Sequence, residues 1–179
     1  MRKKIPLTCA SILTIIFCFA QKNNSRSDEN SLARTSFYAE LGGPGILFSA
    51  NIDRRFNKSN LGLGGRIGLG FVSGYLNTDP YNYDEPTSVV TFPVQLNYLF
   101  GKPGSPHSFE AGAGFTLAGK KIGVFDFYDS TASNFFVTAS FMYRRQPANG
   151  GFSWRIGFTP LIAKGYIQPS AAVSVGYNF

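Results

Sequence analysis

The sequence predicts an all-β fold, an eight-stranded antiparallel up-and-down transmembrane β-barrel. Three observations predict it: short runs in which apolar and polar residues alternate, turn residues between those runs, and a composition rich in aromatic residues but poor in charge. Of the 179 residues, 16% are aromatic and 15% are charged, whereas charged residues make up about 25% of an average soluble domain. The length suits one domain, and the apolar content of 44% argues against a disordered chain.

A cleavable export signal is predicted over residues 1–20. Basic residues at positions 2–4 precede an apolar stretch that ends at Ala20. This order is typical of a secretory signal, and the apolar stretch is short for a membrane-spanning helix. Both cysteines, Cys9 and Cys18, lie within this signal. The predicted mature chain therefore has no thiol and forms neither disulfides nor thiolate metal sites.

Loss of the signal also lowers the net charge. The whole chain has 17 basic and 10 acidic residues, and the signal contains Arg2, Lys3 and Lys4, so the mature balance is 14 − 10 = +4. No run of more than two basic residues remains, so we predict no nucleic-acid partner. Residues 21–35 are polar and aperiodic, and we expect them to be a flexible lead-in to a barrel domain over residues 36–179.

Eight alternating runs follow, and we interpret them as the strands of the barrel. The connections after the second, fourth and sixth runs are compact, whereas those over 74–87 and 119–133 are longer. Alternate connections of an up-and-down meander share one end of the sheet. The predicted barrel therefore has short turns at one end and long loops at the other, as outer-membrane barrels with an even number of strands do. The runs cover residues 36–42, 46–55, 61–73, 88–100, 108–118, 134–145, 152–162 and 170–179.

The two faces of each run differ in composition. In the third run, Leu63 and Ile67 share an apolar face, while Arg66 lies on the opposite face among glycines. Only Arg54 departs from the rule that charged residues within the runs fall on the polar face. Those that follow the rule are Glu40, Asp53, Arg55, Arg66, Glu110, Arg144 and Arg155.

The composition of the polar face indicates which face is outside. Apart from isolated charges it consists mostly of Gly, Ser, Thr and Asn, which suits the narrow lumen of an eight-stranded barrel better than a solvated exterior. We therefore predict that the apolar face contacts lipid and that aromatic residues near the run ends form an interfacial girdle. The alternative is a soluble, lipocalin-like barrel that binds an apolar ligand inside.

The last run and a central segment carry a family resemblance. Residues 92–101 followed by 108–114 look like a fourth strand, a turn and a fifth strand, and residues 171–179 alternate regularly up to a final Phe. In this pattern the chain resembles the small outer-membrane β-barrel proteins of Gram-negative bacteria, of the OmpA transmembrane and OmpX type. The resemblance implies a location in the outer membrane and an assembly signal that the barrel-assembly machinery reads, formed by Val173, Val175, Tyr177 and Phe179.

Four charged residues near the middle of their runs are predicted to form a network inside the lumen. Glu40, Arg66, Glu110 and Arg155 share the polar face, and buried charges are costly unless they are paired. We expect this network to plug the barrel and fix its interior. A narrow, porin-like channel for small solutes is the alternative function.

An enzymatic role is not expected. The only histidine, His107, lies in the compact connection 101–107, away from the long loops, so a surface-facing Ser/His site cannot be assembled. We expect it to be a solvated turn residue. The carboxylates of the loop 77–86 match no calcium-binding pattern, so we predict no metal and no cofactor. The expected function is structural or surface-interacting, with membrane lipids as partners and a surface ligand that the sequence does not identify. The loop residues concerned are Asp79, Asp84 and Glu85, with Tyr81 and Tyr83 between them.

Overall fold

The computed structural model describes residues 32–74, 87–123 and 132–179. Within these ranges, Leu32–Phe179 forms one compact unit that contains every strand. The predicted export signal, most of the predicted polar lead-in and the acidic loop 77–86 lie outside the described residues. No helix in the described part of the chain is long and apolar enough to cross a membrane.

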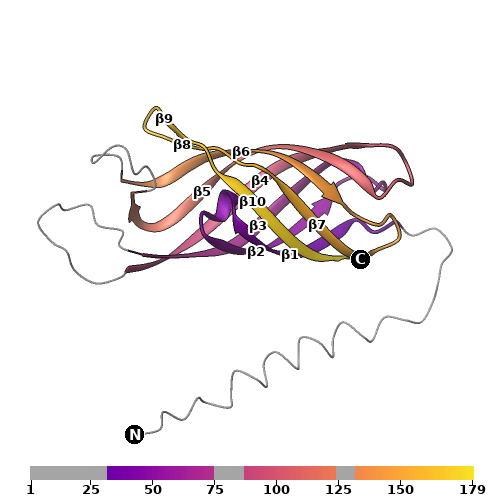
Figure 1. The fold of residues 1–179 in the computed structure, drawn as a ribbon, viewed down its shortest axis with the longest axis horizontal. Helices are drawn as coiled ribbons and strands as arrows, with labels where there is room; N and C mark the ends of the chain where they lie inside the picture. The colour runs from indigo at the N-terminus through magenta and orange to yellow at the C-terminus, as the bar shows by residue number, and fades with distance from the viewer. Residues whose placement is uncertain (1–31, 75–86, 124–131) are drawn as a thin grey trace, which may run out of the picture. The chain divides into compact units, whose positions relative to one another are not determined.

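The described residues form one antiparallel sheet, curled into a barrel (Figure 1). The eight runs predicted from alternation all contain strands, with most ends displaced by one or two residues. The strands are β1 (Thr35–Gly42), β2 (Phe48–Arg55), β3 (Gly62–Gly74), β4 (Thr87–Gly101), β5 (His107–Ile122), β6 (Ser133–Arg145), β7 (Gly151–Phe158), β8 (Leu161–Ala163), β9 (Tyr166–Gln168) and β10 (Ala171–Asn178).

Strand pairing closes the sheet into a ring. Consecutive strands pair from β1 to β7, β10 pairs with β7, and β10 pairs with β1 from Ser36 opposite Asn178 to Gly42 opposite Ala172. Eight strands, β1 to β7 and β10, make up this ring. The predicted eight-stranded antiparallel barrel is therefore confirmed.

The hairpin of β8 and β9 extends the seventh and eighth strands of the ring. We predicted one continuous run over 152–162, but it breaks at Pro160, and Pro169 interrupts the partner strand. Proline has no N–H to donate to a sheet ladder. Beyond the break, β8 pairs with β6 at Val137 and Thr138, so the hairpin prolongs the barrel at the long-loop end.

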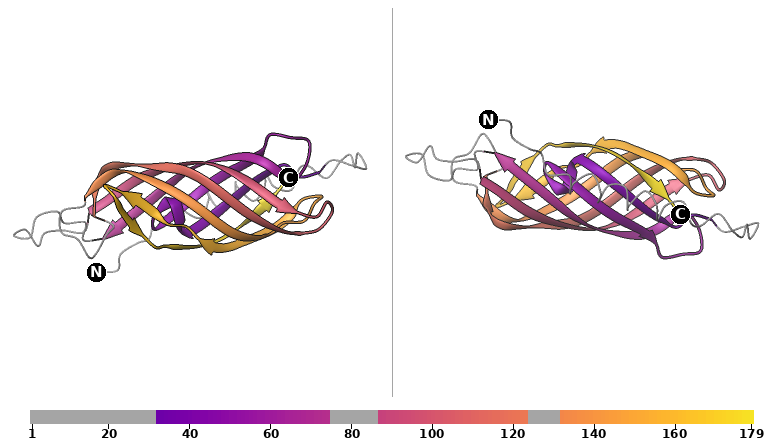
Figure 2. Two further views of the ribbon diagram at one scale, coloured as in Figure 1. Left: turned by 90° about the horizontal axis from the view of Figure 1, so that it is seen from above. Right: turned by 90° about the horizontal axis from the view of Figure 1, so that it is seen from below.

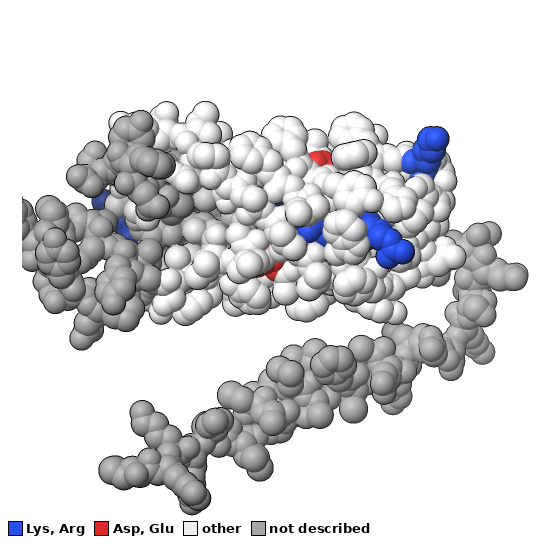
Figure 3. Space-filling view, viewed as in Figure 1, with Lys and Arg blue, Asp and Glu red and all other residues white. Residues whose placement is uncertain are grey.

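Apolar side chains cover the middle of the outer surface of the barrel, and seven charged side chains are buried inside it. Ile67 and Leu69 of β3 are 62% and 56% exposed, while Arg66, which precedes them on the opposite face, is 1% exposed. Figure 3 shows a mostly uncharged surface with Lys and Arg side chains mainly toward the ends of the barrel. The face predicted to be apolar is thus the outer face of the barrel.

Small residues let the polar side chains fill the interior. Gly68 of β3 faces the lumen, and a Cβ atom at that position would overlap Asn51 Oδ1. A glycine is needed there because a larger residue would displace the asparagine. The lumen is therefore packed with side chains, as expected for a barrel of eight strands.

Candidate functional site

A cluster of seven charged side chains occupies the lumen, and each residue in it is at most 2% exposed. It contains three carboxylates and four guanidinium groups. Strand alternation points all seven inward, because they share the lumen-facing parity of their strands. We call them the lumen cluster: Glu40, Asp53, Glu110, Arg55, Arg66, Arg144 and Arg155.

Asp53 of β2 is the centre of the lumen cluster. Its Oδ1 atom accepts a hydrogen bond from Arg55, and its Oδ2 atom accepts one from Arg144. Arg155 Nη1 lies 3.5 Å from the same Oδ2 atom, and Asn97 Nδ2 donates to it at 3.2 Å. One buried carboxylate is thus shared by three guanidinium groups, which satisfies the rule that buried charges are paired and hydrogen-bonded.

Glu110 of β5 pairs with two of the same arginines. Its Oε2 atom lies 2.8 Å from Arg144 Nη2 and 3.5 Å from Arg155 Nη1. Its Oε1 atom accepts a hydrogen bond from Asn97 Nδ2 at 3.1 Å. Asn97 therefore bridges the two carboxylates, which would otherwise repel each other in a low-dielectric interior.

The remaining pair joins this group through a tyrosine. Arg66 Nη1 lies 3.3 Å from Glu40 Oε2 and donates a hydrogen bond to the hydroxyl of Tyr38 at 3.0 Å. The guanidinium carbon of Arg155 lies 3.2 Å from the centre of the Tyr38 ring. Tyr38 of β1 therefore connects the Glu40–Arg66 pair to the part of the cluster around Asp53.

The structure places all four residues of the predicted network in the lumen, as two contacting pairs, Glu40 with Arg66 and Glu110 with Arg155. Sequence reasoning missed the role of Asp53, Arg55 and Arg144, although their parity already placed them on the polar face. The prediction included only charged residues near the middle of their runs, and these three lie nearer the run ends. Position within a run does not decide which side chains meet, because the strands of a barrel are staggered relative to one another.

Above the lumen cluster, toward the long-loop end, the lumen becomes apolar. Five buried side chains from β4, β5, β6 and β8 pack together there, and Ile46 packs against them. Alternation predicts a polar inward face along every strand, so this apolar layer differs from the prediction. Its residues are Val89, Ala118, Ile122, Phe136 and Ala163.

The connection between β1 and β2 enters this apolar layer. We predicted a short connection near residues 43–45, and the structure shows a 3-10 turn, η1 (Gly43–Gly45), whose three residues are all buried. Figure 2 shows this turn inside the ring of strands. Thr116 Oγ1 donates to the Pro44 carbonyl at 2.6 Å, and Thr91 Oγ1 donates to the Gly45 carbonyl at 3.0 Å.

The inward turn lies directly against the lumen cluster. A Cβ atom on Gly43 would sit 2.9 Å from Glu40 Oε1, and Gly43 has a φ of +70°. Ile46, which leaves the turn, has φ 78° and ψ −69°, a rare and strained conformation for a β-branched residue. Such strain persists only where surrounding contacts fix it, which here are the threonine bonds and the apolar layer.

His107 and the four residues of the predicted assembly signal all lie on the outer face. His107 begins β5 and is exposed, but it is not simply solvated: its Nδ1 atom lies 2.5 Å from the hydroxyl of Tyr143. Strand β10 closes the barrel between β1 and β7. Three outward side chains of β10 and the Phe179 side chain that follows the strand are 49% to 65% exposed: Val173, Val175, Tyr177 and Phe179.

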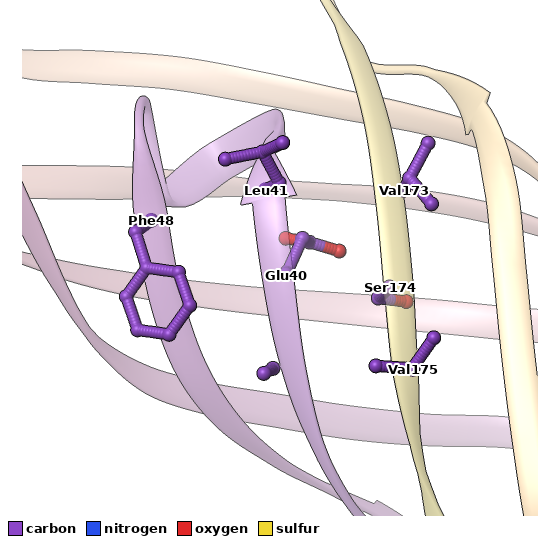
Figure 4. Close-up of a pocket in the computed structure, with 7 residues that line it drawn as sticks. Glu40, Leu41, Phe48, Val173, Ser174 and Val175 are labelled. Carbon is purple, nitrogen blue, oxygen red and sulfur yellow. The ribbon is translucent and has the colours of Figure 1, made fainter.

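The outer face also holds a hollow of about 230 Å³ over β1 and β10. Figure 4 shows the side chains of Leu41, Phe48 and Val173 around it. Its lining surface is almost entirely apolar, and the Glu40 carboxylate at this level is bound to Arg66 inside the barrel. In the described ranges no group of three His, Cys, Asp or Glu residues is placed to hold a metal ion.

Comparison with solved structures finds a similar fold. The chain matches the crystal structure of the N-terminal β-barrel domain of Pseudomonas aeruginosa OprF with a TM-score of 0.55 and 13% sequence identity. The match covers 84% of this chain and 98% of that chain. No family model matches the chain, and no curated protein matches it. The likeness agrees with the fold that the sequence resemblance predicted, a closed eight-stranded β-barrel.

Proposed function

We propose that the chain is an integral outer-membrane β-barrel protein with a structural or surface-interaction role, whose lumen is plugged rather than open. The observation that carries the proposal is the distribution of side chains, which is the reverse of that in a soluble protein. The charged lumen cluster is buried inside a closed ring of strands, while rows of large apolar side chains cover the outside. A closed ring also satisfies the backbone hydrogen bonds that lipid cannot satisfy.

The exposed apolar surface argues against the soluble alternative. A lipocalin-like barrel would turn its apolar rows inward around a ligand, whereas here Leu41, Ile67 and Leu96 are each about 60% exposed on the outside. Soluble monomers rarely expose contiguous apolar patches of more than a few hundred Å². A lipid environment accounts for this surface without a further partner.

Two layers support a plugged lumen. The lumen cluster fills the barrel with paired charges, and the η1 turn with its apolar layer fills the end next to the long loops. Displacing either layer means exposing apolar side chains or separating buried ion pairs, and breaking a buried pair costs about 3–5 kcal/mol. This favours a stabilised, closed barrel.

A narrow channel for small solutes is a second candidate function. It is favoured by buried polar atoms that have no protein partner among the described residues, including Arg66 Nη2, Arg155 Nη2 and Gln95 Nε2. Such atoms are commonly satisfied by water, and a chain of waters is what a narrow pore requires. Conductance across planar bilayers distinguishes the two functions: a plugged barrel gives no steady current, and a channel gives discrete conductance steps.

The barrel-assembly machinery is proposed as a partner during insertion. The outward side chains of β10 and of Phe179, which follows it, alternate regularly with inward-facing residues. The strand closes the barrel, so it is a suitable segment to be recognised before closure. Replacement of Phe179 by Ala should reduce the amount of protein in the outer membrane and increase the amount in the periplasm. Replacement of Phe109, an equally exposed aromatic residue on β5, is the matched control and should have a smaller effect.

Cell fractionation tests the proposed location. Expressing cells are separated into soluble, inner-membrane and outer-membrane fractions, and the outer membrane is then extracted with carbonate. We expect the protein in the outer-membrane pellet both before and after extraction. Recovery in the soluble periplasmic fraction would contradict the proposal and would make an apolar ligand for the barrel the next question.

A further inference from the structure

The charges of the barrel are segregated between its inside and its outside. All three acidic residues that the structure describes, Glu40, Asp53 and Glu110, lie in the lumen. Exposed cations surround the barrel at the end with the short turns, without an exposed Asp or Glu in the described part of the chain. These cations are Arg54, Lys58, Lys102 and Arg145.

Arg145, one of these cations, lies next to aromatic residues of the neighbouring strands. Arg145 at the end of β6 is paired in register with His107 on one side and with Trp154 on the other. The Tyr143 ring lies two residues along the same face, with its centre 5.4 Å from that of Trp154, and its hydroxyl contacts His107. Lys102 is exposed in the adjoining turn. We call these five residues the turn-end patch.

We infer that the turn-end patch binds the phosphate headgroup of an anionic phospholipid in the leaflet next to the short turns. This inference rests on the proposed membrane location. The position fits, because aromatic side chains at a barrel end lie at the headgroup level of the bilayer. The chemistry fits as well: a guanidinium group binds phosphate with two parallel N–H donors, and the Trp154 indole supplies a further N–H donor.

Charge distinguishes this lipid from a zwitterionic one. Each basic residue near a bilayer surface favours an anionic environment by about 1 kcal/mol, or roughly fivefold in occupancy. With Arg145 and Lys102 in the patch and the described acidic residues buried in the lumen, nothing in the described surface offsets that attraction. We therefore expect enrichment of anionic lipid at the patch, and we expect high salt to weaken it, because exposed charges are screened.

The fluorescence of Trp154 can test this inference, because Trp154 is the single tryptophan of the chain. The full chain is folded into phosphatidylcholine vesicles that contain equal fractions of either brominated phosphatidylglycerol or brominated phosphatidylcholine. Bromine quenches tryptophan fluorescence only at short range, so quenching reports which lipid contacts the patch. We expect phosphatidylglycerol to quench several-fold more effectively, and we expect the R145Q/K102Q double variant to lose the difference.

The matched control is Lys121→Gln, an exposed lysine at the opposite end of the barrel, which should keep the preference. Equal quenching by the two lipids, or a preference that survives in the R145Q/K102Q variant, would overturn the inference while leaving the membrane location intact. Absence of quenching by both lipids would instead contradict the proposed function, because the outer face would then not contact lipid.

Discussion

The guanidinium group of Arg155 lies over the ring of Tyr38, with its carbon 3.2 Å from the ring centre. The hydroxyl of the same ring accepts a hydrogen bond from Arg66 at 3.0 Å. Two arginines from β7 and β3 therefore meet one side chain of β1, which is completely enclosed by the lumen. This contact makes the charged interior one connected cluster instead of two separate groups of ion pairs.

Substitutions of Tyr38 test that connection. Tyr38→Phe removes only the hydrogen bond to Arg66 and should lower the free energy of unfolding by about 1 kcal/mol. Tyr38→Leu also removes the ring beneath Arg155, and loss of a desolvated cation–π contact adds about 2 kcal/mol. Urea unfolding in detergent micelles, followed by Trp154 fluorescence, measures both values. Equal losses for the two variants would show that the ring contact contributes nothing.

The Glu40–Arg66 pair should be more sensitive to loss of one partner than to loss of both. Arg66→Ala leaves Glu40 buried without its arginine and should lower the free energy of unfolding by about 3–5 kcal/mol, and Arg155→Ala should act in the same direction. The E40Q/R66M double variant removes the unpaired charge and should recover part of that loss.

The exposed Lys102→Gln variant serves as the control for the pair, since exposed substitutions usually change stability by less than about 0.5 kcal/mol. The idea of a stabilising plug fails if the unfolding midpoints of Arg66→Ala and Arg155→Ala equal that of the unsubstituted protein.

If the outer face contacts lipid, the cost of placing a charged residue on it should depend on the depth of that residue in the bilayer. Leu69 lies near the middle of β3 and Leu63 near its short-turn end, and both point outward. Arginine at a bilayer midplane destabilises a barrel by about 2–4 kcal/mol, against about 0–1 kcal/mol near the interface. Leu69→Arg should therefore reduce folding into vesicles much more than Leu63→Arg. Similar yields for the two variants would mean that neither position is in lipid.

Because the η1 turn packs inside the lumen, we expect alanine substitutions at Gly43 and Gly104 to differ in their effect on stability. Gly43 and Gly104 both have positive φ, but a Cβ atom on Gly43 would press on Glu40 and Ala172, whereas one on Gly104 meets nothing within 4 Å. Gly104→Ala should lower the free energy of unfolding only by the cost of backbone strain, about 1 kcal/mol. Gly43→Ala should lower the free energy of unfolding by more than that. Detergent unfolding of the two variants, with planar-bilayer conductance as a second reading, makes the comparison. Identical behaviour would show that the turn does not pack against the lumen cluster.

The fold was predictable because strand alternation has a period of two. That period placed Arg66 and Glu110 on the face opposite to Ile67, and the composition of the polar face indicated that this face is the inner one. The turn residues between the runs indicated the number of strands. Exposure confirms these placements. Alternation contains no information on how far each strand is shifted along its neighbour, however, and that shift decides which inward side chains meet.

Contacts between distant strands account for what the sequence did not predict. Asp53 meets Arg144 although 91 residues separate them, so its central place in the lumen cluster depends on the stagger of the closed barrel. The inward path of Gly43–Gly45 depends on Thr91 and Thr116, which belong to other strands. A short Gly-Pro-Gly connection is locally typical of an ordinary turn, so its burial could not be inferred from its own residues.

The central claim is a closed barrel whose apolar face contacts lipid, and gel mobility of the detergent-folded protein tests it most directly. Samples with and without boiling are compared by electrophoresis. Because the closed hydrogen-bonded ring resists unfolding by detergent at room temperature, we predict that the unboiled protein migrates as a compact band and that boiling shifts it to its unfolded position. A single mobility under both conditions, together with solubility in the absence of detergent, would contradict the claim.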